Sequence, residues 1–314
     1  MWTSGIEALL ILALGLVIDL ALGDPASAIH PVAWMGKVIS FLVKSGSGHR
    51  PLPQFLYGIL IVLIIIAVFV TPVYFGLFYL KSLSAVAYVV AGAILFKITF
   101  SLRGLWRAAL GIKTLLQQEK LAEARFELRA LVGRDTARLD KSQMVSATVE
   151  SVAENSCDSF VAPLFYFLLF GVTGAMAYRA VNTLDAVIGH HGEFEYLGKF
   201  AARLDSAANY IPARITALII ILSAWVCRKN ASAAWRTMLR DRKNTESPNA
   251  GWTMSAIAGA LGVQLEKVGY YKLGDSRNSL SLSTIQASLQ IIMTAALIWS
   301  LLIVLAGVIY HATT

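Results

Sequence analysis

The apolar run from Phe55 to Leu80 constrains the fold more than any other feature of the sequence. It contains no charged residue, and about 20 consecutive apolar residues are enough for a helix to cross a bilayer. Pro72 predicts a kink within it, because proline removes a helical hydrogen bond. Four other runs have the same character, although some are shorter: Ile6 to Leu22, Leu83 to Phe100, Ile215 to Cys227 and Ile285 to Tyr310.

The composition agrees with a membrane protein. Apolar residues make up 57% and charged residues 15% of the 314 residues, whereas soluble domains average about 25% charged residues. The sequence therefore predicts an all-α, polytopic integral membrane protein with about five or six spans, folded as a single membrane domain over residues 1–314. No basic patch is interleaved with aromatic residues, so we exclude nucleic acid as a partner and expect membrane lipid around the chain.

The distribution of basic residues predicts the orientation of the chain. Segments 23–54, 101–158 and 228–284 hold three, nine and nine Lys or Arg residues, against one at 81–82 and three in 179–208. Basic loops tend to stay in the cytoplasm. We therefore expect cytoplasmic helical segments around 101–158 and 228–284, an outside N-terminus, a location in the cytoplasmic (inner) membrane, and an active site that faces the cytoplasm.

Three carboxylates recur every fourth residue, at Glu150, Glu154 and Asp158, so a helix places them on one face. Like charges stacked in this way repel by about 0.2–0.5 kcal/mol per pair when exposed, and by more when water is removed. A divalent metal, a Lys/Arg cluster or a basic substrate is therefore expected to face the stripe. The alternative is a solvated helix face, against which the adjoining apolar segment and the amide of Asn155 argue.

The carboxylate stripe runs into an apolar segment, Phe160 to Ala177. Three polar residues follow at helical spacing: Arg179, Asn182 and Asp185. A straight span would place these two polar groups on opposite sides of the membrane. Helix-disrupting residues favour a re-entrant segment instead, made of two half-helices that enter the membrane and return: Pro163, Gly171 and Gly174. We therefore expect Ser146, His190 and Glu193 to be accessible from one side.

Other polar residues gather near expected turns. One group flanks Pro212, which is expected to open a helix: Arg203, Asp205, Asn209 and Arg214. Gly133 is expected to end the amphipathic helix that begins at Arg103, with Arg134 and Asp135 directly after it. His30 precedes Pro31 and is expected to be extended. Small residues in 256–262 predict close helix packing, and residues 269–283 are expected to form a loop.

Several of these motifs, in this order, resemble those of the cobinamide-phosphate synthases, a family of multipass membrane enzymes of cobalamin biosynthesis. The resemblance extends over nearly the whole chain. Its motifs are Gly23-Asp24-Pro25, His30-Pro31-Val32, Gly133–Thr136, Val149–Asn155 with Asp158, Ala162–Phe165, Tyr178–Asp185, Arg203-Leu204-Asp205, Asn209, Ile211–Arg214 and Ser247-Pro248-Asn249. One departure is Ser206, where family members often have a second aspartate, so a paired carboxylate is in doubt there.

The resemblance implies an ATP-dependent amide ligase, a carbon–nitrogen ligase that joins aminopropanol or its phosphate to a propionate side chain of adenosylcobyric acid. Such a reaction asks for Mg²⁺ held by carboxylates and for cations around phosphate oxygens. The expected metal ligands are Glu150, Glu154 and Asp158, and the expected catalytic residues are Glu154, Asp158 and Asp185. The residues expected to bind the substrates are His30, Arg134, Asp135, Asn155, Arg179, Asn182, Arg203, Asp205, Asn209 and Arg214.

Two alternatives stay open beside the ligase. One is a non-enzymatic membrane regulator or sensor of the same superfamily. The other is a small-molecule transporter, which also uses broken helices and charges inside the membrane, although no internal hydropathy repeat supports it. The sequence has no GxxxxGK[ST] motif, so motifs alone do not locate the nucleotide site. Other cobalamin-pathway enzymes are candidates for partners.

Overall fold

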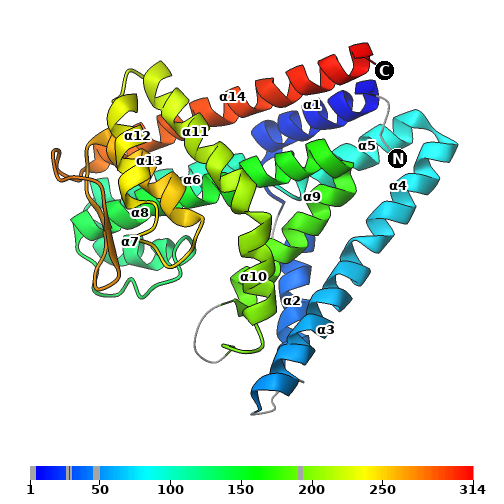
Figure 1. Ribbon diagram of the computed structural model, residues 1–314, viewed down its shortest axis with the longest axis horizontal. Helices are drawn as coiled ribbons and strands as arrows, with labels where there is room; N and C mark the ends of the chain where they lie inside the picture. The colour runs from blue at the N-terminus through cyan, green and yellow to red at the C-terminus, as the bar shows by residue number, and fades with distance from the viewer. Residues whose placement is uncertain (1–4, 26–27, 29, 45–49, 190–193, 314) are drawn as a thin grey trace. The chain divides into compact units, whose positions relative to one another are not determined.

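The computed structural model describes residues 5–25, 28, 30–44, 50–189 and 194–313, and it is almost entirely helical (Figure 1). Its contacts divide the chain into two compact units. Within the described residues, five helices are long and apolar enough to span a membrane, or six if the helices on either side of Asn209 count as one broken span. The predicted all-α, polytopic fold is confirmed. A single membrane domain stays a prediction.

Unit 1 comprises residues 1–101, 162–208 and 303–314. Pro31 and Pro51 open two of its helices, at positions where a missing N–H costs no helical hydrogen bond. The long apolar run divides into two helices at Val70, two residues before Pro72, although the backbone of Val70 is itself right-handed helical. The kink at Pro72 stays a prediction. The helices are α1 (Gly5–Leu22), α2 (Pro31–Lys44), α3 (Pro51–Phe69), α4 (Thr71–Leu83), α5 (Ala85–Lys97), α9 (Ala162–Ile188), α10 (Lys199–Ala208) and, from Ile303, α14 (Leu282–Thr313).

The core of unit 1 lies where α9 packs against α2, α3 and α10. Met35, Ile61 and Leu184 contribute fully buried side chains from three of these helices. α1 packs along α5, and Gly92 permits the close approach, since a Cβ atom there would lie 2.8 Å from Cδ1 of Ile11. The contacts of α9 with α2, α3 and α10 fix its position within unit 1, and α9 carries three of the predicted site residues.

Unit 2 comprises residues 102–161 and 209–302. Its helix α8 begins with a capping box, in which the Asp140 carboxylate accepts from the Gln143 backbone N–H and the Gln143 side chain accepts from the Asp140 N–H. The elements are α6 (Leu102–Gln117), α7 (Leu121–Leu128), α8 (Lys141–Ser156), a π-helical turn (Cys157–Val161), α11 (Tyr210–Val226), α12 (Ala231–Asp241), α13 (Ala250–Leu261), β1 (Leu265–Lys267), β2 (Tyr271–Leu273) and α14 as far as Leu302.

The small-residue helix of unit 2 packs as predicted. A Cβ atom on Gly259 of α13 would lie 2.6 Å from the carbonyl oxygen of Ala233 in α12. The two helices therefore approach at a distance that only glycine permits. Gly262 ends α13 in the left-handed conformation, with φ of 63°.

Three local predictions need correction. The single amphipathic helix expected from Arg103 to Gly133 is two helices, which end at Gln117 and Leu128. A positive φ of 58° at Glu119 interrupts the helix there, and Thr136 then donates a hydrogen bond to the carbonyl of Arg125, which folds the following segment back onto α7. The loop expected over 269–283 contains β2, paired antiparallel with β1. The helix α2 was not predicted.

The central break in α9 occurs at Gly171. Its φ of 67° and ψ of −159° are not helical, and this region of backbone conformation is essentially restricted to glycine. Figure 1 shows α9 sharply bent. The predicted division into two half-helices is thus confirmed, whereas their return to one side of the membrane stays a prediction. Residues 190–193, whose accessibility was predicted, lie outside the described residues.

The backbone at Gly171 yields a testable prediction. An added Cβ atom would meet nothing within 4 Å, so the effect of Gly171→Ala is backbone strain alone. We expect this change to lower the free energy of unfolding in detergent by about 1–3 kcal/mol. The control is Gly76→Ala in α4, where a Cβ atom also meets nothing and alanine should be neutral or stabilising. Equal melting temperatures for the two variants would contradict the break.

Candidate functional site

The carboxylate of Glu150 is buried in unit 2 and is fully partnered. It accepts hydrogen bonds from Ser146 Oγ at 2.6 Å and from the Tyr271 hydroxyl at 2.8 Å, and it forms an ion pair with Arg134 Nη2 at 3.2 Å. Burial, together with the charge and hydrogen bond of Glu150, raises the pKa of Tyr271 well above its ordinary value. Arg134 is therefore a cation facing the stripe, as one of the predicted alternatives required.

Glu154, Asn155 and Asp158 lie further along the same segment and are half-buried. The Asn155 amide donates to the carbonyl and hydroxyl oxygens of Ser151, both at 3.0 Å. The α-helix ends at Ser156, and Asp158 lies in the π-helical turn, a feature often found at functional sites. The two half-buried carboxylates are thus separated by a change of helical pitch and do not form a regular i, i+4 pair.

No group of three or more His, Cys, Asp or Glu side chains in the described part of the chain is placed to hold a metal ion. Mg²⁺, however, commonly uses one or two carboxylates, and substrate phosphates and water supply the remaining ligands. Glu154 and Asp158 fit that mode, and a metal cage made only of protein ligands does not fit.

A second polar cluster lies in unit 1 at the end of α1. The Lys97 ammonium contacts Asp19 Oδ1 at 3.0 Å and Asp24 Oδ1 at 2.7 Å, and the side chains of Lys97 and Asp19 are almost fully buried. Ser101 also donates to Asp24. Burial alone would raise the pKa of Asp24, but the hydrogen bonds from Lys97 and Ser101 outweigh it and hold that pKa below its ordinary value.

His30 follows this cluster and directly precedes α2. Its Nδ1 accepts a hydrogen bond from the Val32 backbone N–H at 3.2 Å, so the ring caps the first turn of the helix. Burial, with smaller contributions from the positive charges of Arg179 and Lys97, lowers the pKa of His30, although Asp24 acts in the opposite sense. The imidazole is therefore neutral at physiological pH, and its Nδ1 is the acceptor.

A third polar group links α9 to α10 within unit 1. Arg179 Nη1 donates to Asn182 Oδ1 at 3.4 Å, and Asn182 Nδ2 donates to Asp205 Oδ1 at 3.3 Å. Asp185 lies two turns beyond Arg179 and is half-buried, whereas Arg203 is exposed. The structure therefore brings the Tyr178–Asp185 motif and the Arg203–Asp205 motif together, a contact that the sequence did not predict.

Arg214 in unit 2 stands between aromatic rings. Its guanidinium lies 3.4 Å from the Tyr210 ring centroid and 4.6 Å from that of Trp252, and its Nη1 donates to Asn249 Oδ1 at 3.2 Å. This contact joins the Ile211–Arg214 motif to the Ser247–Asn249 motif. The guanidinium of Arg242 also stacks on the Trp252 ring, 4.8 Å from the ring centroid.

Two predicted residues have local roles that the structure defines. Asp135 is exposed, and its Oδ1 accepts from the Ala137 backbone N–H at 2.9 Å, which makes a local turn. Asn209 is buried, and its Oδ1 accepts from the Cys157 thiol at 3.8 Å. The predicted substrate-binding, catalytic and metal-binding roles of all these residues stay predictions.

Several contributing residues were not predicted. Lys97 lies in an apolar run, Tyr271 lies in an expected loop, and Trp252 lies in a helix for which only close packing through small residues was predicted. A lysine inside a spanning segment signals a buried partner, so the sequence offered a sign of Lys97. Tyr271 and Trp252 have no such sign, because their roles depend on contacts between segments far apart in the chain.

The fold and its buried polar clusters define a polytopic helical membrane protein. The model of the CobD/CbiB protein family matches residues 12–298. The chain is 52% identical to the cobalamin biosynthesis protein CobD of Dehalococcoides mccartyi (strain CBDB1), over 98% of this chain and 99% of that protein. It is 36% identical to the cobalamin biosynthesis protein CbiB of Salmonella choleraesuis (strain SC-B67), over 89% and 91% of the two chains.

The chain therefore belongs to the CobD/CbiB family, as the sequence motifs indicated, and its general role lies in cobalamin biosynthesis. A further relative is a probable cobalamin biosynthesis protein CobD from Methanothermobacter thermautotrophicus, 40% identical over 86% of this chain and 88% of that protein. No solved structure gives a significant match.

The partners of Glu150 yield a second prediction. Tyr271→Phe removes one hydrogen bond to a buried carboxylate and should lower the free energy of unfolding by about 1.5–3 kcal/mol. Glu150→Gln leaves the Arg134 guanidinium without its counter-charge and should cost about 3–5 kcal/mol. Because both changes affect one network, the double variant should lose less than the sum of the two. Denaturant unfolding of purified protein in detergent measures all three.

Tyr270→Phe is the matched control, since Tyr270 is 63% exposed and has no such bond. If Tyr271→Phe and Tyr270→Phe lowered the free energy of unfolding by the same small amount, the hydrogen bond from Tyr271 to Glu150 would contribute nothing to stability. Strict additivity in the double variant would show that Tyr271 and Glu150 do not act as one network.

Proposed function

We propose that the protein is an ATP-dependent amide ligase of cobalamin biosynthesis. Its substrates are a propionate side chain of adenosylcobyric acid and the amine of aminopropanol or of aminopropanol phosphate. The observation that carries the proposal is membership of the CobD/CbiB family over residues 12–298. The half-buried carboxylates of Glu154 and Asp158 beside a π-helical turn support it, because they offer oxygen ligands to a phosphate-bound cation.

The proposed reaction proceeds in two balanced steps. A propionate oxygen attacks the γ-phosphorus of ATP, an acyl phosphate forms and ADP leaves. The amine nitrogen then attacks the acyl carbon, the C–N bond forms, the C–O bond to phosphate breaks, and inorganic phosphate leaves. One amine proton passes to a base, for which we propose Asp185. Bound Mg²⁺ would neutralise the phosphate oxygens during the first step.

Glu154 and Asp158 are proposed as the Mg²⁺ ligands. Glu150 belonged to the same predicted stripe, but its carboxylate already accepts from Ser146 and Tyr271 and pairs with Arg134. We therefore propose that Glu150 and Arg134 position the helix and that the metal lies further along it. The partial exposure of Glu154 and Asp158 leaves them able to reach a substrate-bound ion.

The arginines are proposed to bind the anionic groups of the substrates. The guanidinium of Arg214 is planar and ringed by aromatic faces, and its described hydrogen bonds go to the Tyr210 carbonyl and the Asn249 amide oxygen, not to a carboxylate. Its charge is thus available to phosphate or carboxylate oxygens. Arg179 and Arg203 are proposed for the same task, with His30, Asn155, Asn182 and Asn209 as polar contacts.

Orientation and partners follow from the same proposal. From the basic segments we propose that the site lies on the cytoplasmic side of the cytoplasmic membrane, where ATP is available, with lipid around the spans. Other enzymes of the pathway are proposed as partners that deliver the corrinoid. A regulator or a transporter would show no chemical turnover, and this difference separates the ligase from both alternatives.

Activity of the purified protein in detergent tests the proposal. With adenosylcobyric acid, aminopropanol phosphate or aminopropanol, and Mg·ATP, we expect a corrinoid amide, ADP and phosphate in equal amounts, measured by mass spectrometry and phosphate release. Glu154→Gln keeps the shape of the side chain and removes a metal ligand, so turnover should fall by about 100-fold or more. The melting temperature should change little, because Glu154 is only half-buried.

Glu123→Gln is the matched control, since Glu123 is exposed on α7 and makes only a surface ion pair with Lys120. This variant should keep full turnover. ATP-independent uptake of corrinoid without amide formation would reject the ligase. Normal turnover in Glu154→Gln would leave the ligase standing and move its metal site elsewhere.

A further inference from the structure

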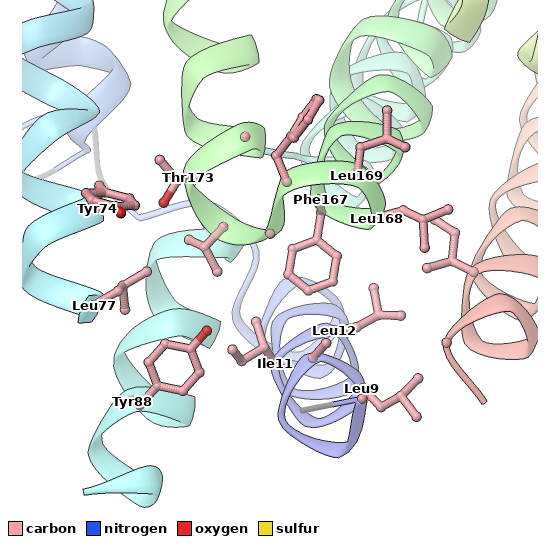
Figure 2. A pocket seen from close by; sticks show the side chains of 18 of the residues that line it. Leu9, Ile11, Leu12, Tyr74, Leu77, Tyr88, Phe167, Leu168, Leu169 and Thr173 are labelled. Atoms are coloured by element: carbon pink, nitrogen blue, oxygen red, sulfur yellow. The ribbon is translucent and has the colours of Figure 1, made fainter. Parts of the chain in front are cut away.

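Unit 1 contains a large cavity where α9 bends at Gly171. Its volume is about 780 Å³, and its walls are the first turns of α1, the end of α4, Tyr88 of α5, residues 167–174 of α9 and the end of α14 from Ile303. All these residues belong to unit 1. Figure 2 shows side chains of α1, α4, α5 and α9 pointing into one space. The volume lies within the range of about 300–1,000 Å³ typical of ligand sites.

The lining is predominantly apolar, with polar groups from a few residues. Leu12, Leu77 and Phe167 supply hydrocarbon and aromatic surface. Among the described lining residues, Lys81 supplies an ammonium, which forms an ion pair with Glu7 at 3.2 Å and lies over the Tyr88 ring at 5.4 Å. Lys81 lies in the last turn of α4 and Glu7 in the first turn of α1. The Lys81 ammonium therefore lies at one end of the cavity.

Water is a poor occupant of this space. Every lining residue lies in a helix long and apolar enough to span a membrane. A buried water molecule needs roughly two to four polar partners, and a predominantly apolar lining offers few of them. The cavity is also continuous with surface that faces lipid: Phe78 and Phe170 line it and are 52% and 67% exposed. A hydrocarbon chain from the bilayer can therefore enter it without leaving an apolar environment.

We propose that this cavity binds an acyl chain of a membrane glycerophospholipid, whose phosphate lies at Lys81. A half-helix that turns back at Gly171 leaves unfilled the space that a full span would occupy, and the acyl chain fills it. The lipid thereby supports the bend in α9, on which Arg179 lies two turns further along. With the orientation predicted from the basic residues, the lipid comes from the outer leaflet. The proposal does not depend on the ligase reaction.

Native mass spectrometry of the purified protein tests this site. The protein is washed with detergent and then titrated with phosphatidylglycerol that carries one palmitoyl and one oleoyl chain. Wild-type protein should retain or rebind one tightly held phospholipid. Ala8→Phe places a ring in the cavity, since Ala8 lines it, and should weaken this binding by roughly tenfold or more. Ala67→Phe is the matched control, because Ala67 is exposed on α3 and lies outside the cavity.

Two further variants keep the proposal falsifiable. Thr173→Phe fills the cavity from α9 and replaces Ala8→Phe if that variant does not fold. Lys81→Met should weaken the anionic phospholipid but leave binding of an uncharged diacylglycerol unchanged. Added phospholipid should raise the melting temperature of wild type and Ala67→Phe, and raise it less in the filled variants. The proposal would be overturned if a filled variant, Ala8→Phe or Thr173→Phe, bound as much lipid as the control Ala67→Phe. It would also be overturned if wild-type protein neither retained nor rebound a phospholipid.

Discussion

The cost of placing charge in hydrocarbon constrains this structure more than any other interaction. The stretch from Lys141 to Ile188 has 48 residues, and as one straight helix it would be about 70 Å long, more than twice the thickness of a hydrocarbon core of about 30 Å. Its polar residues stand at both ends of the apolar middle. The bend at Gly171 offers a way to keep both ends at one membrane surface.

Charges that do lie among the spans are neutralised locally. Lys97 is held between Asp19 and Asp24, and Glu150 between Arg134 and Tyr271. Each of these clusters connects segments distant in the sequence, so charge pairing positions the loops that carry the family motifs. His30 directly precedes α2 and follows the first cluster in the chain, and the second cluster fixes α8 just before Glu154. Buried ion pairs of this kind specify an arrangement more than they stabilise it.

Much of this fold could be predicted from the sequence, because the signals were local. Apolar length predicted the spans, and the set of Pro163, Gly171 and Gly174 predicted a broken segment, in which the structure places the break at Gly171. The hairpin of β1 and β2 could not be predicted, since its three-residue strands carry no alternation and Tyr271 is anchored by Glu150 from far along the chain. The early end of α7 depends likewise on the contact between Thr136 and Arg125.

The candidate site was predicted as a set of residues rather than as a geometry. Helical spacing indicated that Glu150, Glu154 and Asp158 share a face, but spacing does not show that Arg134 already satisfies one of them or that the helix changes pitch before another. The link from Asn182 to Asp205 was not predicted either, because it joins two helices that are separated in the sequence. The stacking of Arg214 on Trp252 could not be predicted, because it depends on the packing of α11 against α13, two helices far apart in the chain.

The account depends most on both ends of the Lys141–Ile188 stretch facing one compartment, and cysteine labelling measures this directly. Ser146 is buried and bonded to Glu150, so single cysteines belong at the exposed Ser142 and Ala186, in a variant that lacks Cys157 and Cys227. An impermeant thiol reagent should leave both unlabelled in intact cells and label both in inverted membrane vesicles. Labelling of one position in cells and of the other only in inverted vesicles would contradict the re-entrant arrangement.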